Sequence, residues 1–135
     1  MKTRTALAAL TLTTLALPLA AIAPSTASPA SPAKSGAVRT HGGCGGPAVW
    51  KLKAKPDNGR IQLEAEVDSN HVGQVWDWTI KHNGSIASKG SSTTHGASGS
   101  FTVNRRLANR AGTDNFVFRA ERRATGAVCR GTISL

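Results

Sequence analysis

The chain has 135 residues and a formal net charge of +10, from 17 Lys and Arg against 7 Asp and Glu. This length suits a single domain, so several independent domains are excluded. Only 4% of the residues are aromatic, and Cys occurs twice. The composition therefore excludes a disulfide-dense scaffold and a four-cysteine zinc site, and no ligand cluster or glycine fingerprint predicts a metal ion or a cofactor.

The N-terminus predicts a secretory signal peptide. Lys2 and Arg4 precede a Leu- and Ala-rich run over residues 6–23 that is diluted by threonines. A membrane-spanning helix needs about 20 strongly apolar residues, so we expect no membrane span after cleavage. Small residues favour cleavage after Ala27. We therefore assign residues 1–27 to the signal peptide and expect a secreted protein, either extracellular or associated with the cell wall.

Residues 28–43 are rich in Pro, Ser, Ala and Gly and show no periodic apolar pattern. We interpret them as a flexible leader, because they cannot bury enough surface to offset their ordering entropy. The folded domain is then expected over residues 44–135. In an oxidising exterior Cys44 and Cys129 have only each other as partners, so we expect a disulfide that brackets the domain. The alternative is two free thiols.

Most of the remaining chain alternates between apolar and polar residues, which is typical of β-strands with one buried face. In chain order, we expect seven strands over residues 50–55, 61–67, 74–82, 85–90, 100–107, 115–122 and 129–135. With turn signals between them and no helical period, they predict an all-β fold, a seven-stranded antiparallel β-sandwich.

Two turns set the expected strand pairing. A turn over residues 56–59 would place Lys55 opposite Arg60. Asn83-Gly84 is a strong signal for a two-residue hairpin turn, which would place Trp78 opposite Lys89.

The order of strands, with two hairpins and a large aromatic residue on the third strand, resembles immunoglobulin-like and fibronectin-like domains. The expected disulfide differs from the immunoglobulin one, because it joins the start of the domain to its last strand. Phe116 stands near the position of the tyrosine corner and has no hydroxyl group.

A second resemblance is carried by Cys44 and by residues 50–53, 59–61, 66–68, 73–78, 83–85, 99–101, 112–114 and 129–130. At these positions the chain resembles a group of small actinobacterial secreted proteins of unassigned function. The resemblance covers about residues 44–135. It implies the fold and export, and it carries no catalytic or binding residues.

No arrangement of residues predicts catalysis. Residues 96–100 lack the second glycine and the strand–turn–helix context of a nucleophile elbow. The four histidines have no partner at metal-ligand spacing, and we interpret all four as surface side chains near turns: His41, His71, His82 and His95. The seven carboxylates fall mostly on outward strand positions or turns, where they balance lysines. We therefore expect that the protein is not an enzyme.

Tryptophans and arginines are the candidates for a binding surface. We expect Trp50, Trp76 and Trp78 to pack in the core, with the ring of Trp78 the most exposed of the three. Arginines gather in the C-terminal third of the chain, where they could form a basic patch. The candidate binding surface consists of Trp78, Lys89, Arg119, Arg122, Arg123 and Arg130. A solvated surface without a ligand is the alternative interpretation.

An anionic cell-wall polymer or an extracellular protein would fit such a surface. Nucleic acid is the least favoured partner, because export removes access to it and no stacking aromatic residues lie among the arginines. We thus expect a secreted, non-catalytic binding module at the cell envelope or in the extracellular space. The alternative is an inhibitor of extracellular serine proteases, with residues 91–99 or 108–113 as the reactive loop, although neither loop lies near a cysteine.

Overall fold

The computed structural model describes residues 34–135. The expected signal peptide and the first part of the expected leader lie outside these residues. The described chain forms eight strands: β1 (Val38–Gly43), β2 (Val49–Asp57), β3 (Arg60–Asp68), β4 (Val75–His82), β5 (Ser85–Thr93), β6 (Ser100–Ala108), β7 (Asn115–Arg122) and β8 (Val128–Ser134).

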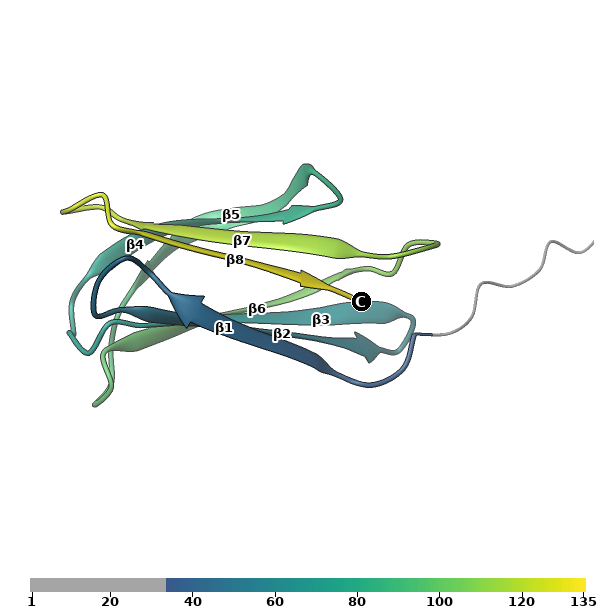
Figure 1. The fold of residues 1–135 in the computed structure, drawn as a ribbon, viewed down its shortest axis with the longest axis horizontal. Helices are drawn as coiled ribbons and strands as arrows, with labels where there is room; N and C mark the ends of the chain where they lie inside the picture. Colours follow the sequence, from purple (N-terminus) through teal and green to yellow (C-terminus); the bar gives the residue numbers. More distant parts are fainter. Residues whose placement is uncertain (1–33) are drawn as a thin grey trace, which may run out of the picture.

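The strands form two antiparallel sheets that face each other (Figure 1), in the orders β1-β2-β3-β6 and β5-β4-β7-β8. The connections from β3 to β4, from β5 to β6 and from β6 to β7 each pass from one sheet to the other. The prediction of an all-β fold with two antiparallel sheets is confirmed. The predicted number of strands, seven, is wrong, because an additional strand precedes the first one expected.

That additional strand, β1, pairs along its whole length with β2, from Val38 opposite Ala54 to Gly43 opposite Val49. The expectation of a flexible leader up to residue 43 is therefore wrong from Val38 onward, and the domain begins before Cys44. Backbone pairing with β2 stabilises the strand, and burial of large apolar side chains does not. Its Gly42 also leaves room for Trp50, since a Cβ at Gly42 would lie 2.7 Å from Trp50 Cζ2.

The β2–β3 hairpin turns over only two residues, Asn58 and Gly59, whose φ angles of 47° and 73° are those of a type I′ turn. Pro56 and Asp57 continue the strand, and Asp57 faces Arg60. The expected pairing of Lys55 with Arg60 is therefore wrong by two positions. The observed register replaces that like-charge contact with one between opposite charges.

The β4–β5 hairpin turns over Asn83 and Gly84, as predicted, with φ angles of 48° and 86°. A bulge between Ile80 and Lys81 then shifts the register, so that Trp78 faces Gly90 and not Lys89. A Cβ at Gly90 would lie 2.7 Å from Trp78 Cζ2. The bulge thus places a residue without a side chain where the indole ring needs space. Strand β5 also continues three residues beyond its expected end at residue 90.

The core lies between the inner faces of the two sheets. Its largest fully buried side chains include Trp76, Phe116, Phe118, Leu52, Ile61 and Leu63. The exposed fractions of the three tryptophans are 8% for Trp50, 1% for Trp76 and 4% for Trp78. The prediction that the tryptophans pack in the core is confirmed.

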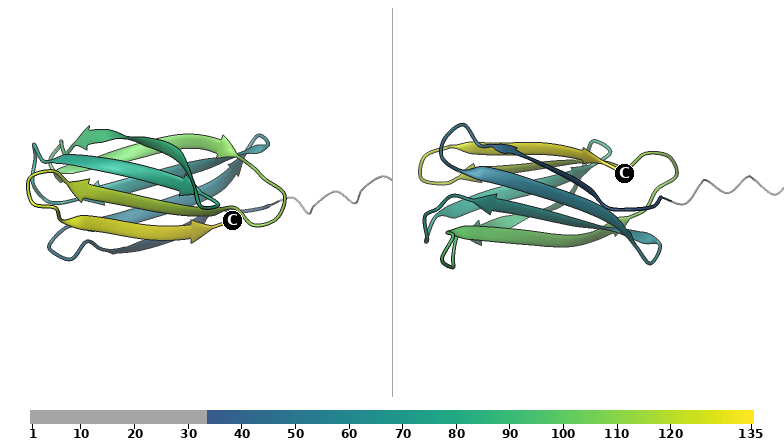
Figure 2. Two further views of the ribbon diagram at one scale, coloured as in Figure 1. Left: turned by 90° about the horizontal axis from the view of Figure 1, so that it is seen from above. Right: turned by 60° about the horizontal axis from the view of Figure 1, so that its bottom comes forward.

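A disulfide joins Cys44, just after β1, to Cys129 on β8, and so links the two sheets. The predicted pairing is confirmed. Strands β1 and β8 belong to different sheets but lie side by side (Figure 2). The bond is consistent with an oxidising, extracellular environment. No helix within residues 34–135 is long and apolar enough to cross a membrane.

Candidate functional site

A row of basic side chains crosses the outer surface of the sheet β5-β4-β7-β8. Thr79 on β4 lies between Lys89 on β5 and Arg119 on β7. Arg119 in turn faces Arg130 on β8. The three basic side chains are exposed and belong to three different strands. We call Lys89, Arg119 and Arg130 the cationic row. Its members are far apart in the sequence, and strand pairing brings them together.

The charges of this row are only partly balanced. Arg119 Nη2 lies 2.6 Å from Glu121 Oε2, two residues further along β7. Among residues 34–135, Lys89 and Arg130 form no ion pair. A shallow cleft of about 610 Å³ runs over this surface, with Lys89, Arg119 and Glu121 among the residues that line it. The row therefore presents net positive charge to the solvent.

Arg123 lies on the same surface but is held by an acidic partner. Its Nε and Nη2 donate to the two carboxylate oxygens of Asp77 at 3.1 and 2.6 Å, which is a bidentate arrangement. Hydrogen bonds from Arg123 and from the Ser91 hydroxyl lower the pKa of Asp77 to about 2. The hydrogen bond to Asp77 in turn raises the pKa of Arg123. Arg123 thus contributes little unbalanced charge to the surface.

Trp78 does not belong to the outer surface. Its side chain points into the core, and its indole Nε1 donates to Ser92 Oγ at 3.0 Å. The guanidinium of Arg105, on β6, lies 5.0 Å from the centroid of the ring. Arg105 Nε also donates to Ser88 Oγ on β5, so this arginine bridges the two sheets above the ring. The expectation that Trp78 is the most exposed of the three tryptophans is wrong, because Trp50 is more exposed.

Arg122 also lies apart from the other arginines. It follows Phe116, Phe118 and Ala120 on the inward side of β7. On the neighbouring strand β4, it pairs with Trp76. Its side chain is partly buried at the end of the core, and its Nε is buried with no hydrogen-bond partner among residues 34–135. The expected cluster of Arg119, Arg122, Arg123 and Arg130 on one face is therefore incomplete, because Arg122 points to the other side of its strand.

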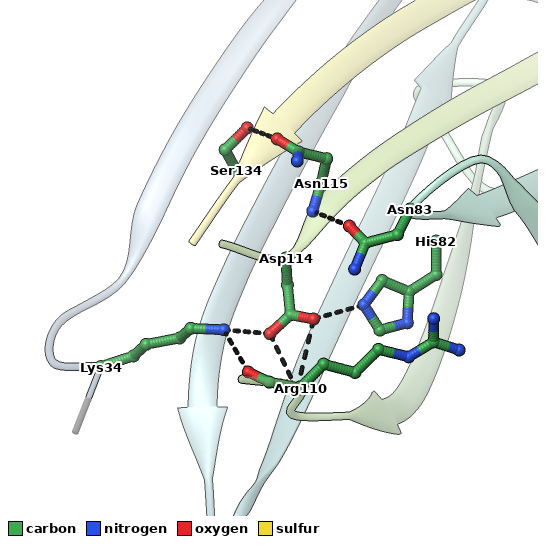
Figure 3. A network of polar contacts seen from close by, with 7 residues as sticks. All are labelled: Lys34, His82, Asn83, Arg110, Asp114, Asn115 and Ser134. Carbon is green, nitrogen blue, oxygen red and sulfur yellow. Dashed lines mark hydrogen bonds and ion pairs between the residues drawn. The ribbon is translucent and has the colours of Figure 1, made fainter. Parts of the chain in front are cut away.

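A second polar group lies inside the protein, at the opposite end of β7. Asp114 and His82 are 0% and 2% exposed, and His82 Nε2 lies 2.5 Å from Asp114 Oδ1. The ammonium group of Lys34 contacts the other oxygen of Asp114, and the backbone N–H of Arg110 donates to the same carboxylate (Figure 3). We call Lys34, His82, Arg110 and Asp114 the Asp114 network.

The sequence interpretation placed His82 at the surface, and this is wrong. His82 has the same strand parity as Trp76, Trp78 and Ile80, and this alternation was the signal that could have placed it inside. Nothing in the sequence around Asp114 indicated its burial, because its partners come from three separate segments. The other three histidines are exposed, as expected.

The geometry of the Asp114 network favours a structural role. Burial by itself raises the pKa of Asp114, but hydrogen bonds from Lys34, His82 and the Arg110 backbone together outweigh it, and the pKa lies below its usual value. The His82 ring stacks on Phe116, with centroids 4.6 Å apart. Within residues 34–135, no hydroxyl or thiol group hydrogen-bonds to this ring, so the pair lacks the nucleophile of a hydrolase triad.

The described residues contain no group of three His, Cys, Asp or Glu side chains placed to hold a metal ion. Ser98, in the glycine-rich segment 96–100, is exposed and shares a hydrogen bond with Ser100, at 2.9 Å. The segment is a tight turn that leads into β6, with no helix behind it.

Comparisons of the chain with protein-family models, with curated proteins and with solved structures give no match.

Proposed function

We propose that this protein is a secreted, non-catalytic binding module that holds an anionic polymer of the cell envelope on the outer surface of the sheet β5-β4-β7-β8. The observation that carries the proposal is the cationic row. Lys89, Arg119 and Arg130 lie on three strands of one sheet, and only Arg119 has an acidic partner among the described residues. Repeated negative charges along a polymer would match such a row, because each basic side chain can meet a separate anionic group.

The strand order supports an immunoglobulin-like or fibronectin-like assignment of the domain. In immunoglobulin sandwiches strands A, B and E share one sheet and C, F and G share the other. Here β2, β3 and β6 share one sheet, and β4, β7 and β8 share the other. With β2 taken as strand A, the chain follows that connectivity, and β1 is an addition at the edge of the first sheet. Domains of this architecture serve many functions, so the surface and not the fold carries the proposed binding.

Export is supported by the signal-like N-terminus and by the disulfide between Cys44 and Cys129. We infer that cleavage after Ala27 releases a chain that begins at Ser28. N-terminal sequencing of protein recovered from the culture medium tests this inference. Recovery of a chain that still begins at Met1 would contradict it.

Retention on purified anionic wall polymer tests the binding. We expect the protein to be retained at low salt and released as added salt screens the charges, with a Debye length of about 10 Å at 0.1 M. A double variant with Lys89→Gln and Arg130→Gln should elute at clearly lower salt. The matched control carries Lys53→Gln and Lys55→Gln on β2, in the other sheet, and removes the same charge.

Equal elution of the two double variants would show that total charge, not the cationic row, governs retention. No retention at low salt would overturn the proposed ligand. Inhibition of secreted serine proteases by the same preparation would instead favour the alternative function of a protease inhibitor.

A further inference from the structure

Arg122 occupies an unusual position for an arginine that has no acidic partner among the described residues. It continues the inward-facing series of β7 at the point where the core ends, next to Trp76 of β4. The Nε atom is buried and has no hydrogen-bond partner among residues 34–135. Within the same residues Arg122 takes part in no ion pair. The guanidinium charge of Arg122 is therefore balanced by no acidic side chain among these residues, and an anionic ligand at the guanidinium would balance it.

Arg122 lines an open cleft of about 770 Å³ at this end of the protein. One wall consists of residues 71–75, and the other consists of residues 122–124, where β7 ends. Ligand pockets for small molecules commonly fall in this range of volume. Arg123 also lines the cleft, but Asp77 holds its guanidinium. The uncompensated positive charge at the cleft is therefore that of Arg122.

Hydrogen bonds hold the walls of this cleft in place. Thr94 is fully buried, its carbonyl accepts the N–H of Gly73 at 2.8 Å, and its hydroxyl oxygen accepts the N–H of Gln74 at 2.9 Å. The N–H of Arg123 donates to the carbonyl of Val75 at 2.9 Å and ties the second wall to the first. A ligand would thus meet a site that needs little ordering before it binds.

The remaining lining gives the cleft an apolar side. Val72 is 67% exposed, which makes it the most exposed large apolar side chain of the described residues. Val75 and Ala124 line the same cleft. A ligand that bears an apolar group could cover Val72 while its charged end reaches Arg122.

We propose that this cleft binds a carboxylate carried next to a small apolar group. The carboxylate would accept hydrogen bonds from the two Nη groups at the end of the Arg122 side chain, in the fork geometry that guanidinium and carboxylate groups share, because Nε is buried. The apolar group would rest on Val72. The site is separate from the cationic row and holds one small group, not a polymer. The C-terminal carboxylate of a peptide that ends in a small apolar residue carries this chemistry, whereas a sugar acid carries the carboxylate without the apolar group.

The test follows the Nε–H resonance of Arg122 by ¹⁵N–¹H NMR in the purified protein. The probes are N-acetylvaline, its neutral analogue N-acetylvalinamide, and glucuronate. We expect a saturable shift of this resonance with N-acetylvaline and none with the amide. A weaker response to glucuronate than to N-acetylvaline would support the apolar contact with Val72. An equal response to the amide, a response to glucuronate alone, or no response to either carboxylate overturns the proposal.

Arg122→Lys keeps the positive charge and removes the pair of Nη donors. Calorimetric titration of this variant with the responding carboxylate should show an affinity lower by about tenfold or more, because the fork is lost. Arg39→Lys, at an exposed position on β1, is the matched control and should bind as the unmodified protein does. Unchanged affinity of Arg122→Lys would overturn the proposal. If this variant does not fold, the comparison of N-acetylvaline with N-acetylvalinamide on the unmodified protein still tests the proposal.

The same titration separates this site from the proposed polymer binding. The double variant with Lys89→Gln and Arg130→Gln should elute from the polymer at lower salt and keep the carboxylate response. Earlier elution together with loss of the carboxylate response in that variant, with its fold intact, would contradict the separation of the two sites.

Discussion

Trp50 of β2 lies against Gly131 of β8, across the interior from one sheet to the other. A Cβ built at Gly131 would lie 2.5 Å from Cζ3 of the Trp50 ring. Gly131 is buried and stands two residues after Cys129, so the ring fills the space beside the disulfide. The absence of a side chain at this position lets the largest side chain of β2 reach the opposite sheet.

Gly131→Ala should therefore destabilise the protein. The added methyl group forces the Trp50 ring or the backbone of β8 to move, and overpacking of this kind typically costs about 1–3 kcal/mol. Denaturant unfolding measures the change. The control is Gly46→Ala, where a Cβ would have no heavy atom within 4 Å, and which should change stability by less than about 0.5 kcal/mol. Equal stability of the two variants would refute the proposed packing.

Reduction of the bond between Cys44 and Cys129 should lower the melting temperature clearly. The two cysteines are 85 residues apart. On the chain-entropy model, closing a loop of this length stabilises the fold by about 4–5 kcal/mol. Calorimetry with and without reductant measures the shift, and the double variant with Cys44→Ala and Cys129→Ala serves as the control that reductant should not affect. Titration of two free thiols in the native protein would contradict the prediction.

Asp114→Asn should be among the most destabilising single substitutions in this protein. It removes the charge that Lys34 and His82 share inside the protein, and breaking a buried charge pair costs about 3–5 kcal/mol. Urea unfolding measures the loss. Asp57→Asn, which breaks the exposed pair with Arg106, is the matched control and should cost no more than about 1 kcal/mol. Similar losses in the two variants would mean that the Asp114 network does not stabilise the fold.

Stability should also depend on the ionisation of Asp114. Its pKa is lowered in the folded state, so the folded protein holds the carboxylate more strongly than the unfolded chain does. The resulting stability is fully present above the unfolded pKa of about 3.9 and is lost as the pH falls toward the folded pKa. Urea unfolding as a function of pH should show this loss, and Asp114→Asn should show less of it. An equal pH dependence in both proteins would rule out Asp114 as its source.

Asp77 should titrate near pH 2, because Arg123 and Ser91 donate hydrogen bonds to its carboxylate. Its contribution to stability is present above the unfolded pKa and disappears as the pH falls toward 2. In Arg123→Ala the midpoint should move up toward the usual value of 3.8. Carboxyl ¹³C NMR follows the titration, and Arg130→Ala is the control that should leave the midpoint unchanged. A midpoint near 4 in the unmodified protein would disprove the bidentate contact.

Local patterns in the sequence were sufficient for the strands that form the core. In β2 and β3, every second residue is apolar, and these residues, such as Leu52, Leu63 and Val67, are the buried ones. The Asn83-Gly84 hairpin and the single possible cysteine pairing could also be predicted. Each of these features depends on the period of a strand, on the φ angles of a short turn or on the number of cysteines.

Features that depend on pairing between strands could not be predicted in this way. Strand β1 has no alternating apolar pattern that could have predicted it. Its pairing with the edge of β2 holds it in place. The bulge between Ile80 and Lys81 shifts the register so that Trp78 faces Gly90, which leaves room for its ring. The residues around the bulge do not indicate this shift. Register is a property of two strands together, and one-residue shifts change every neighbour.

For the candidate sites, the sequence by itself determined that basic residues are abundant near the C-terminus and that the domain carries one possible disulfide. Only the tertiary structure decided which arginines act together. Strand parity sends Arg119 and Arg130 to the outer surface, while it turns Arg122 inward to a cleft formed with residues 71–75. Likewise, the contacts of Asp114 with Lys34 and His82 exist only in the folded chain, where three segments that are distant in the sequence lie together. The physical reason is that a side chain's charge is local, whereas its burial and its partners belong to the folded chain.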